Sequence, residues 1–155
     1  MFRGRRTAKK EFQEKTIEVR RVTRVVAGGK RFSFRVSVVI GDLRGRVGFG
    51  VAKGLDVAQA VQKAIVQAKK KMIFVPLKDN RTLLFDVDGK YGAAKVRLKP
   101  ARQNHGLIAG GPVRNILELA GVRDVSAKIL GSTTNKVNNA KATIEALKKF
   151  KRETP

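Results

Sequence analysis

The chain has 155 residues, which is enough for one ordinary domain or two small ones. Hydrophobic residues make up 42% of it, enough for a packed core, which argues against wholesale disorder. The charge is the dominant feature, because 35 Lys and Arg residues against 12 Asp and Glu residues give a net charge of +23. A net positive charge of this size destabilises a compact state by self-repulsion, so the composition predicts a polyanionic partner.

The composition also argues against other classes of protein. No stretch approaches the roughly 20 apolar residues of a membrane span, and no apolar signal-peptide core follows the basic start. The absence of cysteine excludes disulfides and thiolate metal sites and fits a reducing cytosol. With no Trp and one Tyr, base stacking is a poor main mode of binding, so RNA backbone phosphates are the favoured target.

A basic tail opens the chain at residues 1–11, and we expect it either to be disordered or to become ordered against RNA. Residues 17–26 then predict a strand with a bulge near Arg20 and Arg21. The paired glycines in residues 27–30 supply positive φ without steric cost, so the chain should turn there.

Two more strands and a helix complete the first predicted domain, residues 12–76. The alternation from Phe32 to Ile40 predicts a half-buried strand, and residues 47–51 alternate through a third one. Asp56 is a good helix N-cap, and the apolar residues behind it recur at helical spacing. That helix should end before Pro76.

A second domain is predicted over residues 79–150, followed by a short tail at residues 151–155. Its first two strands should be joined by a turn at Asp88-Gly89. We predict strands over residues 83–87, 94–98 and 122–130. A helix over residues 110–121 should precede the third strand, and a second helix over residues 137–147 should follow it.

The stretch GFGVAKG at residues 48–54 suggests a nucleotide loop, but its spacing is wrong for one. Lys53 stands where a dinucleotide fingerprint needs its third glycine, and no Ser or Thr follows a Gly-Lys pair as in a P-loop. The alternation puts Gly48 and Gly50 on the face opposite Phe49. Bare glycines there would let another backbone approach closely, either RNA or a packed helix.

A second glycine-rich stretch, GLIAGGPVR at residues 106–114, opens a helix directly and could bind phosphate. A tight loop packed against a neighbouring protein or domain is the alternative. His105 is the only histidine, and Asp86 and Asp88 should flank a turn, so no catalytic or metal-binding constellation is predicted.

Four longer stretches are similar, in order and spacing, to one known family. They read RRVTRVVAGGKRFSF, GDLRGRVGFGVAKG, LKPARQNHGLIAGGPVRNILELAGV and GSTTNKVNNAKATIEAL. Together they span roughly residues 12–150, nearly the whole chain. The chain therefore resembles bacterial small-subunit ribosomal protein five, although Leu43 stands where that family often has glycine.

The resemblance implies an α+β fold. The first domain would be a three-stranded antiparallel sheet plus a helix, related to the double-stranded-RNA-binding fold. The second would be a two-layer α/β domain with a left-handed βαβ crossover. The implied role is that of a structural constituent of the cytoplasmic small ribosomal subunit, with no catalytic residue, cofactor or metal. The implied partners are small-subunit ribosomal RNA, ribosomal proteins four and eight, and messenger RNA where it enters the subunit. Contact with protein four would influence decoding accuracy.

The expected RNA contacts are basic residues with glycines that permit close approach: Arg20, Arg21, Arg24, Gly28, Gly29, Lys30, Arg31, Arg44, Arg46, Gly48, Gly50 and Lys53. The resemblance implies that Gly110, Gly111 and Arg114 face protein four. Two alternatives stay open at this point. One is a free-standing RNA chaperone or duplex binder. The other is a small-molecule kinase, whose loop should carry serines and an acid that residues 106–115 lack.

Overall fold

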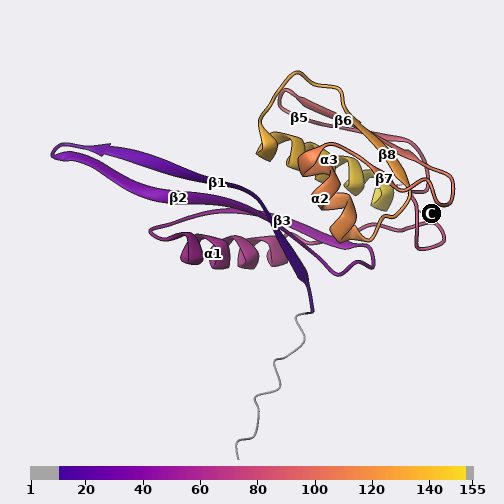
Figure 1. Cartoon of the computed structure of the whole chain (residues 1–155), viewed down its shortest axis with the longest axis horizontal. Coiled ribbons are helices and arrows are strands. Elements are labelled where there is room, and N and C mark those ends of the chain that lie inside the picture. The colour runs from indigo at the N-terminus through magenta and orange to yellow at the C-terminus, as the bar shows by residue number, and fades with distance from the viewer. Residues whose placement is uncertain (1–10, 153–155) are drawn as a thin grey trace, which may run out of the picture.

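The computed structural model describes residues 11–152, which fold into two sheets and three helices (Figure 1). The predicted basic tail lies outside the described residues except for Glu11. Of the predicted C-terminal tail, only residues 151 and 152 are described, as the end of the last helix.

The N-terminal sheet has four antiparallel strands in the order β1-β2-β3-β4. Three of them were predicted, and β4 was not, because two residues are too short to show a period. The predicted bulge near Arg20 and Arg21 is wrong: the register shifts between Thr16 and Glu18, nearer the start of β1. The bounds are β1 (Gln13–Val26), β2 (Gly29–Gly41), β3 (Arg46–Gly54) and β4 (Ile73–Phe74).

Helix α1 (Val57–Lys70) covers one face of this sheet, and it begins where the sequence predicts. The Asp56 carboxylate accepts a hydrogen bond from the N–H of Val57 at 2.7 Å, which satisfies one of the free donors of the first turn. Ala60, Ala64 and Ala68 face the sheet and are buried. These small side chains let the helix lie close to the strands.

The C-terminal sheet has the order β5-β6-β8-β7, and α2 and α3 cover its inner face. Strand β7 pairs directly with β8 in parallel, and α2 connects the two strands along the chain. These three elements form a βαβ unit in an otherwise antiparallel sheet. Strand β7 was not predicted, again because it has only two residues. The bounds are β5 (Val87–Tyr91), β6 (Ala94–Pro100), β7 (Leu107–Ile108), α2 (Gly111–Ala120), β8 (Val125–Ile129) and α3 (Lys136–Arg152).

The predicted turn at Asp88-Gly89 is wrong, because both residues lie inside β5 and the chain turns at residues 92–93. Gly89 is buried beneath α3, and a Cβ there would collide with the backbone carbonyl of Ala142. The glycine therefore permits a close helix–strand approach instead of a turn. Residues 83–86 form no strand, so the predicted first strand starts only at Val87.

The two domains share a core, and this overturns the prediction of a half-buried strand for β2. Val36, Val38 and Ile40 pack toward α1, while Val39 on the opposite face is fully buried with the C-terminal domain. Ser37 on that face is only 2% exposed. The half of β2 farther from the hairpin turn, residues 36–41, is therefore covered on both faces. No helix within residues 11–152 is long and apolar enough to cross a lipid bilayer.

Candidate nucleic-acid interface

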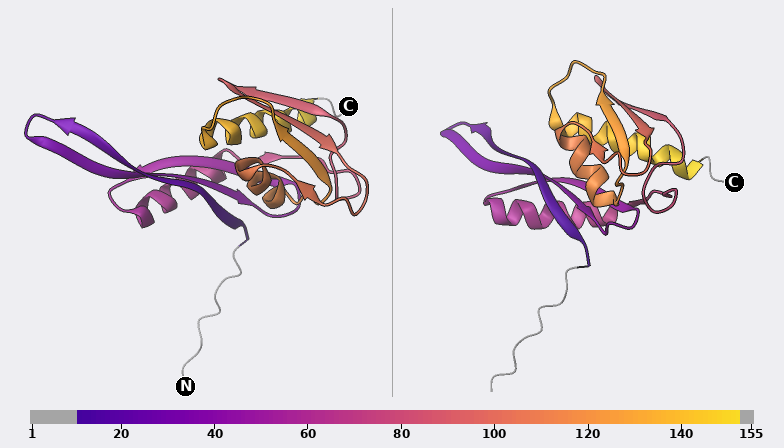
Figure 2. Two further views of the ribbon diagram at one scale, coloured as in Figure 1. Left: turned by 45° about the horizontal axis from the view of Figure 1, so that its top comes forward. Right: turned by 45° about the vertical axis from the view of Figure 1, so that its right-hand side comes forward.

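The hairpin of β1 and β2 extends well beyond the rest of the N-terminal sheet (Figure 2). Strand β3 pairs with β2 only from Phe34 onward, so residues 22–33 form a two-stranded ribbon, here called the arm. An isolated two-stranded hairpin is marginally stable in water. The paired length from Gly29 to Ser33 corresponds to roughly 17 Å of projection. Such a ribbon is a suitable element for contact with a partner.

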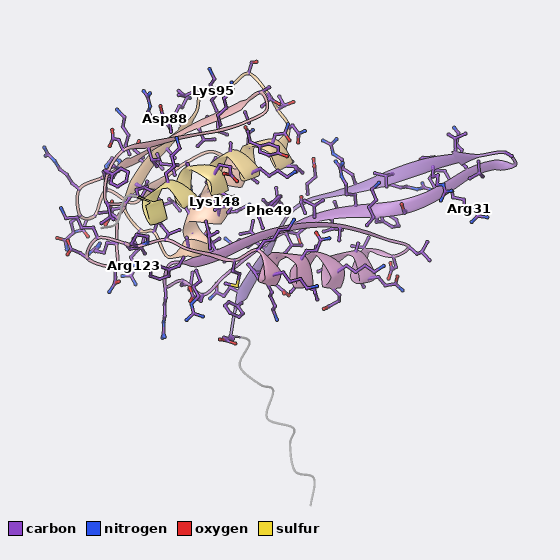
Figure 3. All side chains as sticks on the ribbon, turned by 180° about the vertical axis from the view of Figure 1, so that it is seen from behind. Arg31, Phe49, Asp88, Lys95, Arg123 and Lys148 are labelled. Carbon is purple, nitrogen blue, oxygen red and sulfur yellow. The ribbon has the colours of Figure 1, made fainter. Side chains whose placement is uncertain are left out.

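Five cations share one face of the hairpin, and we call them the cationic ladder: Arg20, Arg24, Arg31, Arg35 and Lys53. Arg24 lies directly opposite Arg31. Arg20 lies opposite Arg35, which in turn lies opposite Lys53 on β3. Figure 3 shows Arg31 far out along the hairpin. Like charges directly opposite one another destabilise a sheet, so this arrangement does not serve folding.

Little within the protein neutralises the ladder. Glu18 pairs with Arg20 at 2.9 Å, but across the described residues no carboxylate pairs with the other four members. Two unit charges about 4 Å apart repel by roughly 1 kcal/mol even in water. A bound row of phosphates would relieve this repulsion, which makes the ladder the best candidate for an RNA backbone contact.

The opposite face of the arm is mixed in character. The Arg21 guanidinium lies 3.8 Å from the ring centroid of Phe32, a cation–π stack at the surface. Phe32 is 47% exposed, so the buried face predicted from Phe32 to Ile40 does not begin at Phe32: the residues of β2 that pack toward α1 begin at Val36. At the tip, Gly28 and Gly29 have open space around them, and Lys30 is exposed beside them.

Two of the predicted glycines do not belong to the interface. Gly48 and Gly50 are buried under α1, and a Cβ on either would collide with the carbonyl of Ala68 or Ala64, respectively. The packed-helix alternative therefore holds at both positions. Their alternation with Phe49 was read correctly, but the sequence could not say which neighbour would lie against them.

Arg44 and Arg46 are exposed, but they lie at the far end of the sheet from the arm. Gly41 ends β2 ten residues after Arg31, which is roughly 33 Å along a strand. The backbone N–H groups of Arg44 and Arg46 donate to the Asp42 carboxylate at 2.8 and 3.0 Å, respectively. The Arg46 side chain also forms an ion pair with this carboxylate at 3.5 Å. These two arginines form a separate group.

Arg35 was not among the RNA contacts expected from the sequence, yet it belongs to the candidate interface. It lies in the ladder between Arg20 and Lys53, and its side chain is only partly buried. The signal was present, because Arg31 and Arg35 share one face of the alternating strand. Its proximity to Lys53 depends on the register between β2 and β3, which no local pattern encodes.

The predicted partner-binding residues cluster at the start of α2. Gly110 caps the helix without a side-chain hydrogen bond, Gly111 has open space around it, and Arg114 is exposed. Val113, Ile116 and Leu117 are fully buried, so Arg114 points away from the core. The start of α2 thus presents bare backbone and one arginine.

A buried carboxylate holds the loop that leads into this helix. Asp124 accepts hydrogen bonds from the backbone N–H of Gly106 and from Arg81 Nε, both at 3.0 Å. The Gly106 N–H is the main reason that the pKa of Asp124 lies below its ordinary value, and Arg81 lowers it further, while burial opposes both. Its side chain is only 3% exposed. Asp124 is therefore a structural anion and is not free to bind a metal.

No catalytic arrangement emerges around the predicted polar residues. Within residues 11–152, no three His, Cys, Asp or Glu side chains gather as a metal site would require. Asp88 forms a bidentate pair with Arg97, at 2.7 and 2.8 Å, and this hydrogen bonding lowers the pKa of Asp88. His105 is exposed in the loop next to Gly106.

Comparison with known proteins agrees with this picture. The model of the ribosomal protein S5 N-terminal domain matches residues 12–76, and that of the ribosomal protein S5 C-terminal domain matches residues 89–154. The chain is 51% identical over 146 residues to small ribosomal subunit protein uS5 of Brucella anthropi. It is 48% identical over 150 residues to the protein of the same name in Dinoroseobacter shibae. These matches span 94% and 95% of this chain and 78% of each relative. The chain belongs to the ribosomal protein S5 family, a family of structural, non-enzymatic proteins.

Proposed function

We propose that this chain is a structural constituent of the small ribosomal subunit that binds small-subunit ribosomal RNA through the cationic ladder. The observation that carries the proposal is the pairing of Arg24 with Arg31 and of Arg35 with both Arg20 and Lys53. These pairs oppose folding in isolation and favour a polyanion on that face. The names of the relatives support the ribosomal setting.

The finer role follows from the family resemblance. We infer that Gly110, Gly111 and Arg114 contact ribosomal protein four, and that the protein also neighbours protein eight. In this proposal the present chain lies along the channel through which messenger RNA enters the subunit, and it influences decoding accuracy through its contact with protein four. The exposed start of α2 supports this assignment, because bare glycine backbone and a free arginine suit a protein contact.

A test of the RNA contact uses a triple variant of the arm, Arg24→Glu, Lys30→Glu and Arg31→Glu. All three residues are exposed and none packs in a core, so the fold should survive. Tagged variant and wild type would compete for incorporation into reconstituted small subunits. We expect several-fold lower incorporation of the variant, because three new acids would repel the phosphates.

The matched control reverses three exposed lysines on the outer face of the C-terminal sheet, Lys95→Glu, Lys99→Glu and Lys128→Glu. It changes the net charge equally but leaves the arm intact. Equal incorporation of the arm variant and the wild type, with unchanged circular dichroism, would refute the contact. A free-standing RNA chaperone would bind duplexes as well as subunits, and co-sedimentation with small subunits in moderate salt separates the two functions.

A further inference from the structure

The outer edge of β3 lies open beyond its first two residues. Strand β4 pairs only with Arg46 and Val47, and across the described residues no strand pairs with this edge from Gly48 to Gly54. An antiparallel ladder uses alternate N–H groups on each side, so about half of those in this stretch face the open edge. Within this stretch Val51 is partly exposed and Lys53 is exposed, so these two positions are the ones that a ligand at the edge can reach.

Two hollows lie along this edge and share Arg35, Val51 and Gln67. One, of about 610 Å³, lies between β3 and α1. The other, of about 770 Å³, lies between β3, the end of α1 and the side of α3, and therefore between the two domains. We call the pair the β3-edge trough. In Figure 3, Phe49 on β3 and Lys148 on α3 mark its interdomain part.

Six cations stand among apolar side chains such as Val51, Val66 and Ile73 in the lining of the trough: Arg35, Lys53, Lys63, Lys71, Lys141 and Lys148. Glu145 is the one carboxylate among its lining residues, and Lys148 already neutralises it at 2.7 Å. Lys141 is partly engaged, since it donates to the Tyr91 hydroxyl at 3.1 Å. The trough therefore has a strong excess of positive charge.

The trough continues the cationic ladder, because Arg35 and Lys53 belong to both. An RNA backbone that follows the ladder inward from Arg24 and Arg31 reaches Arg35 and then enters the trough, and basic side chains lie along this whole path. This continuity and the charge favour RNA over a polypeptide, which would need several acidic side chains here. A positively charged groove that tracks a nucleic-acid backbone is typical of single-strand binding.

We propose that the β3-edge trough holds an unpaired segment of the small-subunit RNA as it leaves the arm, bound through its phosphates. The proposal rests on the RNA contact of the arm proposed above. Both domains take part, with β3 and α1 on one side and α3 on the other. The Lys141 ammonium lies 4.7 Å from the ring centroid of Tyr91, which is 40% exposed. The other aromatic lining residue, Phe49, is buried, so the contacts are mainly to phosphates and not to bases.

Salt dependence tests the charge. The trough variant carries Lys63→Gln, Lys71→Gln and Lys141→Gln, and the control carries Lys95→Gln, Lys99→Gln and Lys128→Gln with the same net charge. Each lost phosphate contact reduces the magnitude of the negative slope of log affinity against log salt by about 0.7 for a single strand. On an unpaired oligouridylate we expect that magnitude to be smaller by about 2 in the trough variant and unchanged in the control.

Equal slopes for the wild type, the trough variant and the control would overturn the trough while leaving the arm intact. Failure of the wild-type protein to bind RNA at all would overturn both proposals. The arm variant with Arg24, Lys30 and Arg31 reversed separates these cases, because it should weaken binding whether or not the trough takes part.

The occupant is identified by a photo-crosslinker at Gln67, which is exposed and lines both hollows. The labelled protein would be assembled into small subunits with messenger RNA present. A crosslink to the subunit RNA supports the proposal. A crosslink only to another protein, only to messenger RNA, or to nothing would overturn it.

Discussion

The backbone N–H of Leu43 donates a hydrogen bond to the carbonyl of Leu119 at 3.1 Å, so a loop of one domain caps the last turn of a helix in the other. The N–H of Gly45 does the same for Ala120 at 2.8 Å. These carbonyls would otherwise lack partners at the end of α2. The hydrogen bonds join the N-terminal sheet to the C-terminal domain, and the shared core around Val39 reinforces the joint.

Gly121→Ala should loosen this joint. Gly121 has φ +86 and a Cβ would collide with the carbonyl of Leu43, so both strain and a clash follow. We expect a loss of roughly 1–3 kcal/mol in the free energy of unfolding, measured by chemical denaturation. Gly111→Ala is the control, because it has open space and a helical position, and it should be neutral or slightly stabilising. Equal stability of the two variants would contradict this account of the joint.

Asp124→Asn should destabilise the protein in a pH-dependent way. The pKa of Asp124 is lower in the folded state than its unfolded value of about 3.9, so its contribution to stability is present above that pH. That contribution disappears as the pH falls through the folded-state pKa. Denaturation curves should therefore show the variant less stable at neutral pH, with the difference from wild type shrinking below about pH 4. Asp86→Asn, at an exposed position, serves as the control. A difference that stays constant with pH would assign the effect to packing.

RNA affinity should depend strongly on salt. If six to ten phosphates are neutralised, affinity for the subunit RNA falls roughly 10³–10⁵-fold between about 50 and 200 mM salt. The structure favours this outcome because the candidate interface consists of arginine and lysine side chains with few free aromatic rings. Filter binding across a salt series measures the slope. A nearly flat titration would show that charge is not the dominant contribution.

Arg114→Glu should disturb the proposed contact with ribosomal protein four more than the fold. Arg114 is exposed on α2, so the free energy of unfolding should change by no more than about 0.5 kcal/mol. Ribosomes carrying the variant should show altered misreading in a reporter assay. The control is Arg123→Glu, an exposed arginine beyond the other end of α2 (Figure 3). Decoding accuracy equal to wild type in the Arg114 variant would argue against this contact.

The sequence by itself determined the features that depend on local periodicity and local capping. Asp56 and the spacing of Ala60, Ala64 and Ala68 defined α1, and the alternation from Phe32 to Ile40 defined the central strand. Each pattern reflects backbone geometry, with 3.6 residues per helical turn and two per strand repeat, so it can be read without neighbours. The charge that predicts a polyanionic partner is likewise a property of composition.

Only the tertiary structure decided which residues meet. The placement of Arg35 between Arg20 and Lys53 follows from the register of three strands, and the burial of Gly48 and Gly50 follows from α1 lying across them. The second buried face of β2 exists because a domain encoded much later in the chain packs on it. These contacts join residues that are distant in sequence, and their free energy comes from packing and electrostatics across the fold, which a local pattern does not contain.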